Sequence, residues 1–136
     1  KHWGVSAHFV DENFDTGDVI QVDRFDIDPK KETALSLERY SQKVLLELFD
    51  KVIKMAIRGE QLPRKSQEQK TGKTYTKPET LSYETVSFDD PADIVETKIR
   101  AFWYPPFAAK IVLNGKKYSL ITPDIMADIA ARYNND

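Results

Sequence analysis

Residues 4–20 of the chain have the sequence GVSAHFVDENFDTGDVI, and this stretch decides how the N-terminal part folds. Polar and apolar residues alternate from Gly4 to Val10, which predicts a β-strand with Ser6 and His8 on one face. A second run that is rich in β-formers extends from Val19 to Phe25. We expect these two strands to pair, with the loop between them presented at one end of the pair.

The loop that joins these strands, DENFDTGD, is unusually acidic. Its carboxylates belong to Asp11, Glu12, Asp15 and Asp18. Gly17 can adopt the positive φ that a tight turn requires. A carboxylate held in such a turn beside His8 suits general acid–base chemistry, if the paired strands bring His8 and Asp15 together. The alternative is that Asp15 and Thr16 only cap the turn and that His8 is a half-buried polar residue.

The same loop begins like a calcium-binding loop, with acidic or amide side chains at Asp11, Asn13 and Asp15. The match then fails, because the glycine comes one place late at Gly17 and Val22 stands where a bidentate glutamate is needed. Strands rather than helices are predicted on both sides of it. Calcium binding is therefore the weaker alternative, and we expect no metal site.

A long amphipathic helix is predicted to begin after Thr33, its N-cap, and to end at about Arg58, with Gly59 in the usual stop position. Apolar residues recur along it at helical spacing, which is typical of a helix that packs against a core. They are Leu37, Val44, Leu45, Leu48, Val52 and Met55.

Residues 60–79, EQLPRKSQEQKTGKTYTKPE, contain almost no apolar side chains except Leu62 and Tyr75, and are typical of a long connection. A local excess of basic residues in this segment could meet phosphates, or could simply be solvated. These residues are Arg64, Lys65, Lys70, Lys73 and Lys77, with Glu68 among them.

After this connection, three short motifs mark the start of a helix or a turn. Asp90, as an N-cap before Pro91, predicts a helix that runs to about Phe102. Asn114-Gly115, between AAKIVL and KKYSLI, predicts a β-hairpin with a two-residue turn. Thr122-Pro123 predicts the start of a short final helix.

Composition excludes several classes of function. The chain has 136 residues, and its 20 Lys plus Arg against 22 Asp plus Glu give a net charge of −2, so no global basic field attracts nucleic acid. With no cysteine and 2 histidines, thiol catalysis, cysteine-ligated zinc and His-rich metal sites are excluded. We find neither a membrane-spanning apolar run nor a signal-peptide pattern, and therefore expect a cytoplasmic protein with no membrane partner.

Residues 4–20 resemble the second signature of the folate-dependent formyltransferases, a G-x-S/T-x-H stretch followed by D-E-x-x-D-T/G-G-x-I/V-I. Two further stretches, in the order that the family shows, strengthen this resemblance. Residues 98–108, KIRAFWYPPFA, are similar to the segment that follows the catalytic domain in the tRNA and sugar branches. Residues 74–77, TYTK, are similar to the linker motif TYxxK of these branches.

The resemblance implies transfer of a formyl group from 10-formyltetrahydrofolate to a primary amine by an Asn, a His and an Asp. Asp15 matches the family's Asp, which orients and charges the catalytic His or relays a proton. Ser6 and His8 match positions that line the same pocket, and these three residues are the catalytic candidates. The loop matches a folate-contacting loop, which gives as cofactor-binding candidates Asp11, Glu12, Asn13, Phe14, Thr16 and Gly17. The linker gives as substrate-binding candidates Lys73, Tyr75 and Lys77.

One large departure from the family limits what this chain can do. The family's N-x-H-P-S stretch does not occur in these residues, and neither His2 nor His8 lies in that context. Phe107 also stands before Ala108 where the family often has Pro or Gly. Because the chain starts at Lys1 without Met, we expect it to be the C-terminal part of a longer enzyme and to be inactive alone.

The expected fold class is α/β, or α+β when the fragment is taken alone. Residues 1–62 are expected to be the C-terminal strands and long helix of a formyltransferase catalytic domain, 63–82 a linker, and 83–136 a small α/β appendage with a hairpin. We prefer a nucleotide-linked amino sugar over initiator tRNA as the acceptor, because a tRNA enzyme usually needs a broad basic surface. The alternative from another class is a non-catalytic module that forms a homodimer through the Asn114-Gly115 hairpin and the Ile125 helix.

Overall fold

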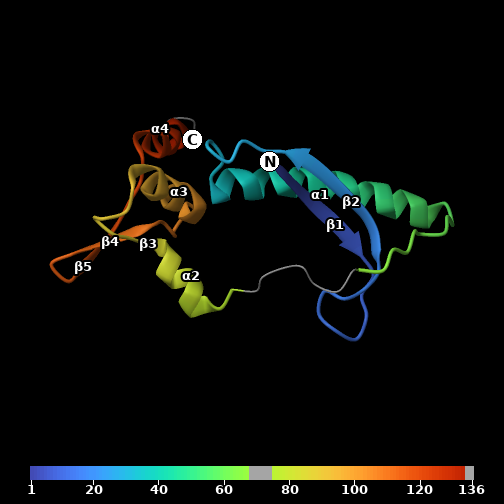
Figure 1. The fold of residues 1–136 in the computed structure, drawn as a ribbon. Coiled ribbons are helices and arrows are strands. Elements are labelled where there is room, and N and C mark those ends of the chain that lie inside the picture. Colours follow the sequence, from blue (N-terminus) through green and yellow to red (C-terminus); the bar gives the residue numbers. More distant parts are fainter. Residues whose placement is uncertain (68–74, 134–136) are drawn as a thin grey trace. The chain divides into compact units, whose positions relative to one another are not determined.

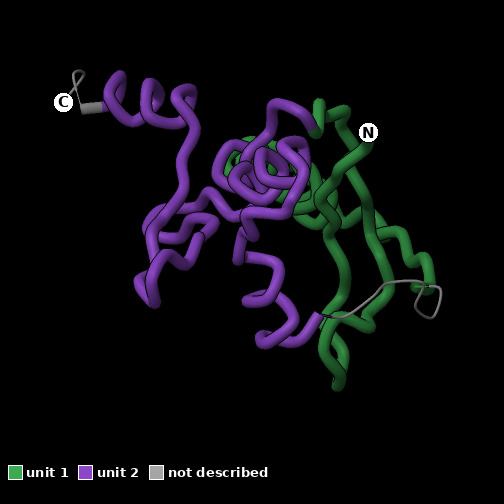
Figure 2. Tube along the Cα trace, turned by 60° about the vertical axis from the view of Figure 1, so that its left-hand side comes forward, with its two compact units in different colours: residues 1–29, 37–73 green, residues 30–36, 74–136 purple. Residues whose placement is uncertain are grey.

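The computed structural model describes residues 1–67 and 75–133, and its contacts divide the chain into two compact units. Unit 1 comprises residues 1–29 and 37–73, and unit 2 comprises residues 30–36 and 74–136 (Figure 2). The predicted domain limits at 62 and 82 remain predictions, since the two units are defined by contacts alone.

Two antiparallel strands form the sheet of unit 1 (Figure 1). Strand β1 extends over His2–His8 and β2 over Val19–Asp26, with Trp3 opposite Phe25 and Ser6 opposite Val22. The predicted pairing is confirmed, but β1 begins and ends two residues earlier than the alternation suggested. It ends early because the register shifts between Ala7 and His8, where the chain turns into the loop.

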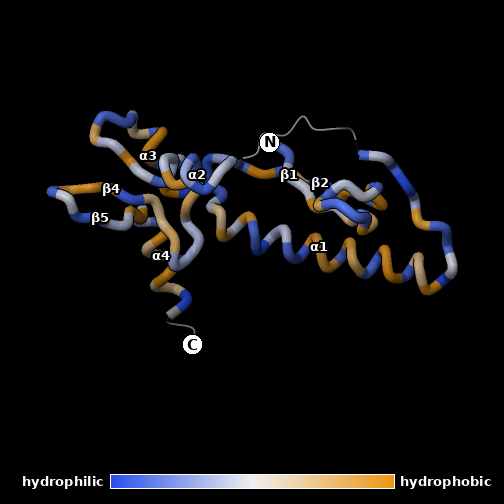
Figure 3. The backbone as a smooth tube through the Cα atoms, turned by 90° about the horizontal axis from the view of Figure 1, so that it is seen from below, coloured by the Kyte–Doolittle hydropathy of each residue, from blue (hydrophilic) through white to orange (hydrophobic). Residues whose placement is uncertain are grey.

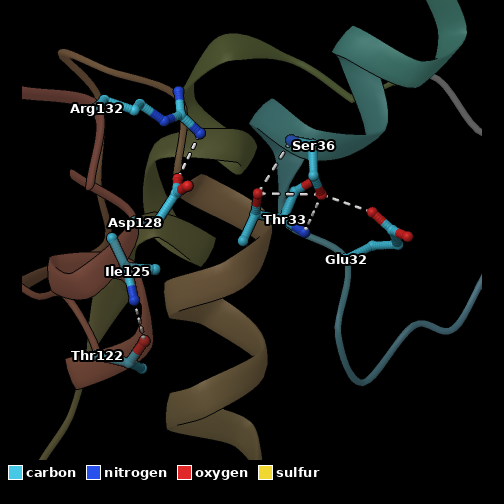
Figure 4. A network of polar contacts seen from close by, with 7 residues as sticks. All are labelled: Glu32, Thr33, Ser36, Thr122, Ile125, Asp128 and Arg132. Carbon is cyan, nitrogen blue, oxygen red and sulfur yellow. Dashed lines mark hydrogen bonds and ion pairs between the residues drawn. The ribbon is translucent and has the colours of Figure 1, made fainter. Parts of the chain in front are cut away.

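Helix α1, Ala34–Ile57, confirms the predicted long helix. Its N-cap is local, because the Thr33 hydroxyl oxygen accepts a hydrogen bond from the Ser36 amide at 3.0 Å (Figure 4). Gly59, two residues after the last residue of the helix, adopts φ 68°, as a left-handed stop residue does.

Helix α1 alternates hydrophobic and hydrophilic turns along its length (Figure 3). Within the described part of unit 1, Leu48 is the one fully buried hydrophobic side chain. Leu45 was expected in the packing stripe but is 39% exposed, which corrects that expectation. The inward positions follow a narrower i, i+3, i+4 pattern than the full apolar set, so Leu45 falls beside the stripe. Several other apolar side chains of α1 are also exposed, namely Leu46, Phe49, Ile53 and Ile57.

The remaining elements belong to unit 2. Helices α2, Lys77–Glu84, and α3, Ala92–Phe102, flank the two-residue strand β3, Thr85–Val86. Strand β4, Lys110–Leu113, pairs in parallel with β3 and antiparallel with β5, Lys116–Ser119. Helix α4, Pro123–Tyr133, ends the described chain. Asn114 and Gly115 take φ 48° and 77°, which confirms the predicted two-residue hairpin turn.

Unit 2 has a continuous hydrophobic core. Its buried members are Val86, Ile99, Trp103, Ala108, Ala109 and Ile125. Phe107-Ala108 departs from the family pattern, but Ala108 and Ala109 are buried in this core. The first strand of the hairpin, β4, begins at the next residue, Lys110.

Two expectations about unit 2 are corrected. Asp90 is not the N-cap of α3; Pro91 occupies that place and makes no side-chain cap bond. The Asp90 carboxylate instead accepts hydrogen bonds from the Lys98 ammonium at 2.7 Å and the Ser87 amide at 2.9 Å. The expected connection over 60–79 also contains the start of α2, because Thr76 and Glu79 form a reciprocal capping box.

Candidate active site

Loop 9–18, which joins β1 and β2, is fixed by short-range hydrogen bonds. The Asp11 carboxylate accepts one from the Thr16 hydroxyl at 2.6 Å and one from the Asn13 amide at 3.0 Å. The Phe9 amide closes the loop onto the Asp18 carbonyl oxygen at 2.9 Å. These bonds, first from Thr16 and then from Asn13, lower the pKa of Asp11, and nearby His8 lowers it further. Asp11 is therefore a structural anion of the loop.

The structure brings His8 and Asp15 together. His8 Nε2 lies 3.9 Å from Asp15 Oδ1, although His8 ends β1 and Asp15 lies within the loop. Asp15 adopts a left-handed φ of 55° and its side chain is 95% exposed, whereas the His8 side chain is 33% exposed. This separation exceeds a hydrogen bond, so Asp15 acts on the imidazole through its charge.

A hydrogen bond to the backbone determines which ring nitrogen of the neutral His8 imidazole carries the proton. Its Nδ1 lies 2.9 Å from the Phe9 carbonyl oxygen, which can only accept, so the Nδ1 proton makes this hydrogen bond. In the neutral imidazole, Nε2 then offers a lone pair toward Asp15. A proton on Nε2 turns the same contact into an attractive ion pair, so the arrangement can hold or relay a proton at Nε2.

Gly17 sets how closely the two ends of the loop approach. It is buried, and a Cβ atom placed on it would lie 1.7 Å from the Phe9 carbonyl oxygen. Among natural residues only glycine fits there without a shift of the backbone. The sequence suggested Gly17 for a positive φ, but the structure shows that the close approach of the chain is the reason for it.

Residues 64–67, which were predicted to be part of a connection, hold this loop in place, and we call them the strap. Lys65 exchanges two backbone hydrogen bonds with Val19, at 2.8 and 3.0 Å. The Arg64 guanidinium stacks on the Phe9 ring with its carbon 3.8 Å from the ring centroid. Gln67 donates from its side-chain amide to the Gly17 carbonyl oxygen at 2.6 Å. All of these contacts span long sequence separations, so no local signal in the sequence announces them.

Ser6, on β1 of unit 1, lines a hollow whose lining does not include His8 or Asp15. It is exposed, and Val19, Val22 and Arg24 are among the other residues that line this hollow of about 370 Å³. In the part of unit 1 that the structure describes, no hydrogen bond or ion pair joins Ser6 to His8 or Asp15. Its proposed role in the same pocket remains a prediction.

The folate-binding candidates occupy the outer surface of the loop. Phe14 is fully exposed at its tip, and Glu12 and Asn13 are exposed beside it. Thr16 and Asp11 are instead committed to each other. Phe14 and the exposed backbone are thus the parts of the loop that are free to meet a planar ligand.

Two of the three linker candidates fall within the described residues, and Lys73 lies outside them. Tyr75 and Tyr83 make an edge-to-face contact with ring centroids 6.1 Å apart. Both line a largely apolar groove of about 450 Å³ in unit 2. Lys77 is exposed at the start of α2. Substrate binding by Tyr75 and Lys77 stays a prediction.

No group of three or more Asp, Glu or His side chains over 1–67 and 75–133 is arranged to hold a metal ion. Within the same ranges, none of the helices combines the length and apolar character that a bilayer crossing would need.

The chain is similar in sequence to a formyltransferase. Methionyl-tRNA formyltransferase from Syntrophomonas wolfei subsp. wolfei is 26% identical over 128 residues, which cover 94% of this chain and 40% of the relative. No protein-family model matches the chain.

Solved structures share the fold. A 4-N formyltransferase from Francisella tularensis superposes with a TM-score of 0.69 at 21% identity, over 85% of this chain and 49% of that one. An N-formyltransferase from Helicobacter canadensis, in complex with folinic acid and dTDP-3-aminofucose, gives 0.67 at 22% identity, over 85% and 42%. The chain therefore has the α/β fold of part of a formyltransferase, and the resemblance seen in its motifs is confirmed. It spans about half or less of the length of these relatives.

Proposed function

We propose that residues 1–62 supply part of the catalytic site of a formyltransferase that uses 10-formyltetrahydrofolate and acts on a primary amine. The approach of His8 to Asp15 within 3.9 Å, inside the loop that carries the family signature, is the observation that carries this proposal. A folate-type donor is supported by the Helicobacter canadensis neighbour, whose structure contains folinic acid.

In the proposed reaction, the amine nitrogen forms a bond to the formyl carbon as the bond from that carbon to the folate nitrogen breaks. The amine must lose a proton and the folate nitrogen must gain one. Asp15 stabilises positive charge on a neighbouring imidazole and thereby helps it to take up that proton. Phe14 and the loop backbone are the residues of this chain that would contact the folate ring.

The proposed catalytic set is incomplete within these 136 residues, because the family's Asn and its N-x-H-P histidine have no counterpart. Burial supports the same conclusion, since the described part of unit 1 fully buries only Leu48 and leaves apolar side chains of α1 exposed. We therefore propose that the chain acts as a part of a larger cytoplasmic enzyme and transfers no formyl group alone.

A nucleotide-linked amino sugar is the proposed acceptor. The net charge of −2 provides no broad attraction for tRNA, and one neighbour with the same fold was solved with dTDP-3-aminofucose. Initiator tRNA is the second candidate, because the curated relative is a methionyl-tRNA formyltransferase. Tyr75, Lys77 and Lys73 stay the candidates for acceptor contact in either case.

The test is a formylation assay with 10-formyltetrahydrofolate, using the full-length protein and the 136-residue chain. We expect product from dTDP-3-aminofucose with the full-length protein, a slower reaction with methionylated initiator tRNA, and none with the 136-residue chain. Faster tRNA formylation would overturn the acceptor choice. Product from the short chain would overturn the claim that its site is incomplete, and no product with either acceptor would overturn the proposed activity.

A further inference from the structure

The position of Asp15 relative to His8 depends on the backbone at the two ends of loop 9–18. The Asp15 side chain is 95% exposed and approaches His8 Nε2 at 3.9 Å, which is too long for a hydrogen bond. Attraction between charges has little directionality, so this contact does not fix its own geometry. Gly17 lies two residues after Asp15, and Phe9 directly follows His8. The placement of Gly17 and Phe9 therefore controls the separation of the pair.

Gln67 of the strap holds the Asp15 side of the loop. Its side-chain amide donates a hydrogen bond to the Gly17 carbonyl oxygen at 2.6 Å, from 50 positions later in the chain. Gly17 is buried, and the carbonyl group of a buried residue needs a donor. Figure 1 shows the chain after α1 returning to β2, where Lys65 exchanges its two backbone hydrogen bonds with Val19. Gln67 therefore reaches the loop from a segment whose backbone is itself fixed.

Arg64 of the strap holds the His8 side of the loop. Its guanidinium carbon lies 3.8 Å from the centroid of the Phe9 ring, a position in which the ring face attracts the cation. The Phe9 carbonyl oxygen in turn accepts the hydrogen bond from His8 Nδ1 at 2.9 Å. Arg64 also lies 3.5 Å from the carboxylate of Asp18, whose carbonyl oxygen accepts from the Phe9 amide. The two strap residues thus act on opposite sides of the His8–Asp15 pair.

We propose that the strap positions the His8–Asp15 pair for catalysis, and that Gln67 is a positioning residue that acts on Asp15 through Gly17. This role rests on the proposed function, formyl transfer. A displacement of a catalytic group by about 1 Å can lower a rate by about 100-fold, and a 3.9 Å contact without a hydrogen bond cannot resist such a displacement. Gln67 is exposed, so its substitution leaves no cavity in the core.

The test is the steady-state kinetics of formyl transfer by the full-length protein. Gln67→Met keeps the length of the side chain and removes its donor, so we expect kcat to fall about tenfold or more while KM changes less than about twofold. Gln67→Lys again places a donor within reach of the Gly17 carbonyl and should restore kcat to within about threefold of wild type. Gln61→Met, at an exposed glutamine of the same segment, is the matched control and should leave kcat unchanged.

A double variant separates positioning from a general effect on the fold. If Gln67 acts through Asp15, Gln67→Met should lower kcat by less than about twofold once Asp15→Asn has removed the charge. A full second loss in that background would overturn the proposal, and so would an unchanged kcat of Gln67→Met beside an active wild type. Absence of product from the wild type would instead overturn the proposed activity, and the positioning role with it.

Discussion

At the scale of single residues, the site loop depends on Gly17. Its α-carbon faces the Phe9 carbonyl so closely that a methyl group would lie 1.7 Å from the oxygen. We expect Gly17→Ala to lower the free energy of unfolding by about 2 kcal/mol or more, because the backbone must move to remove this overlap. Urea denaturation measures this loss.

Asn13→Ala is the matched control in the same loop. Asn13 contributes its backbone amide to Asp11, and that amide survives the substitution. We expect a change within about 0.5 kcal/mol. A Gly17→Ala protein as stable as the Asn13→Ala protein would show that the approach of Gly17 to Phe9 is not required.

At the scale of elements, the start of α3 is tied to the turn before it by the Asp90–Lys98 ion pair, with nitrogen and oxygen 2.7 Å apart. The Lys98 ammonium, and after it the Ser87 amide, lower the pKa of Asp90 below its ordinary 3.8. A lowered pKa means that the contribution to stability is fully present above pH 3.8 and is lost as the pH falls through the folded-state value.

Asp90→Asn should therefore destabilise unit 2 at neutral pH, and the difference from wild type should shrink below pH 3.8. Thermal unfolding across this pH range measures it. Asp89→Asn removes an exposed neighbouring carboxylate and should leave the unfolding temperature near that of wild type. A deficit of Asp90→Asn that stays constant down to low pH would contradict the ion-pair explanation.

Elements with local signals could be predicted from the sequence. The Asn114-Gly115 turn and the Thr33 cap depend on a few adjacent residues, and both are confirmed. The two-residue strand β3 was missed, because it exists only through parallel pairing with the distant β4. Asp90 was assigned to a cap because the local pattern favours it, but Lys98, a full two turns away, binds its carboxylate instead.

The candidate site was also predictable only where its contacts are local. The meeting of His8 and Asp15 follows from a short loop between paired strands, and spacing allowed it as one of two outcomes. The strap could not be predicted, because Arg64 and Gln67 reach residues about 50 positions earlier in the chain. Polar composition suggested a solvated connection and gave no hint of these partners.

At the scale of the whole molecule, the two units differ in how much hydrophobic core each one buries. Unit 2 buries a core that includes Ile99 and Trp103, whereas the described part of unit 1 fully buries only Leu48. The chain also covers only 40% of its curated relative. We infer that the proposed activity requires further protein segments around unit 1.

The central claim is that Asp15 serves formyl transfer, and the activity of an Asp15→Asn full-length protein tests it most directly. Asparagine tolerates the left-handed φ of 55°, so the fold should persist while the charge beside His8 is lost. Asp26→Asn is the control, since Asp26 forms an exposed pair with His2 at 2.6 Å on the opposite end of the same strands. We predict a fall in kcat of about 100-fold or more for Asp15→Asn and no change for Asp26→Asn. Equal activity of the two variants, with both folded, would contradict the claim.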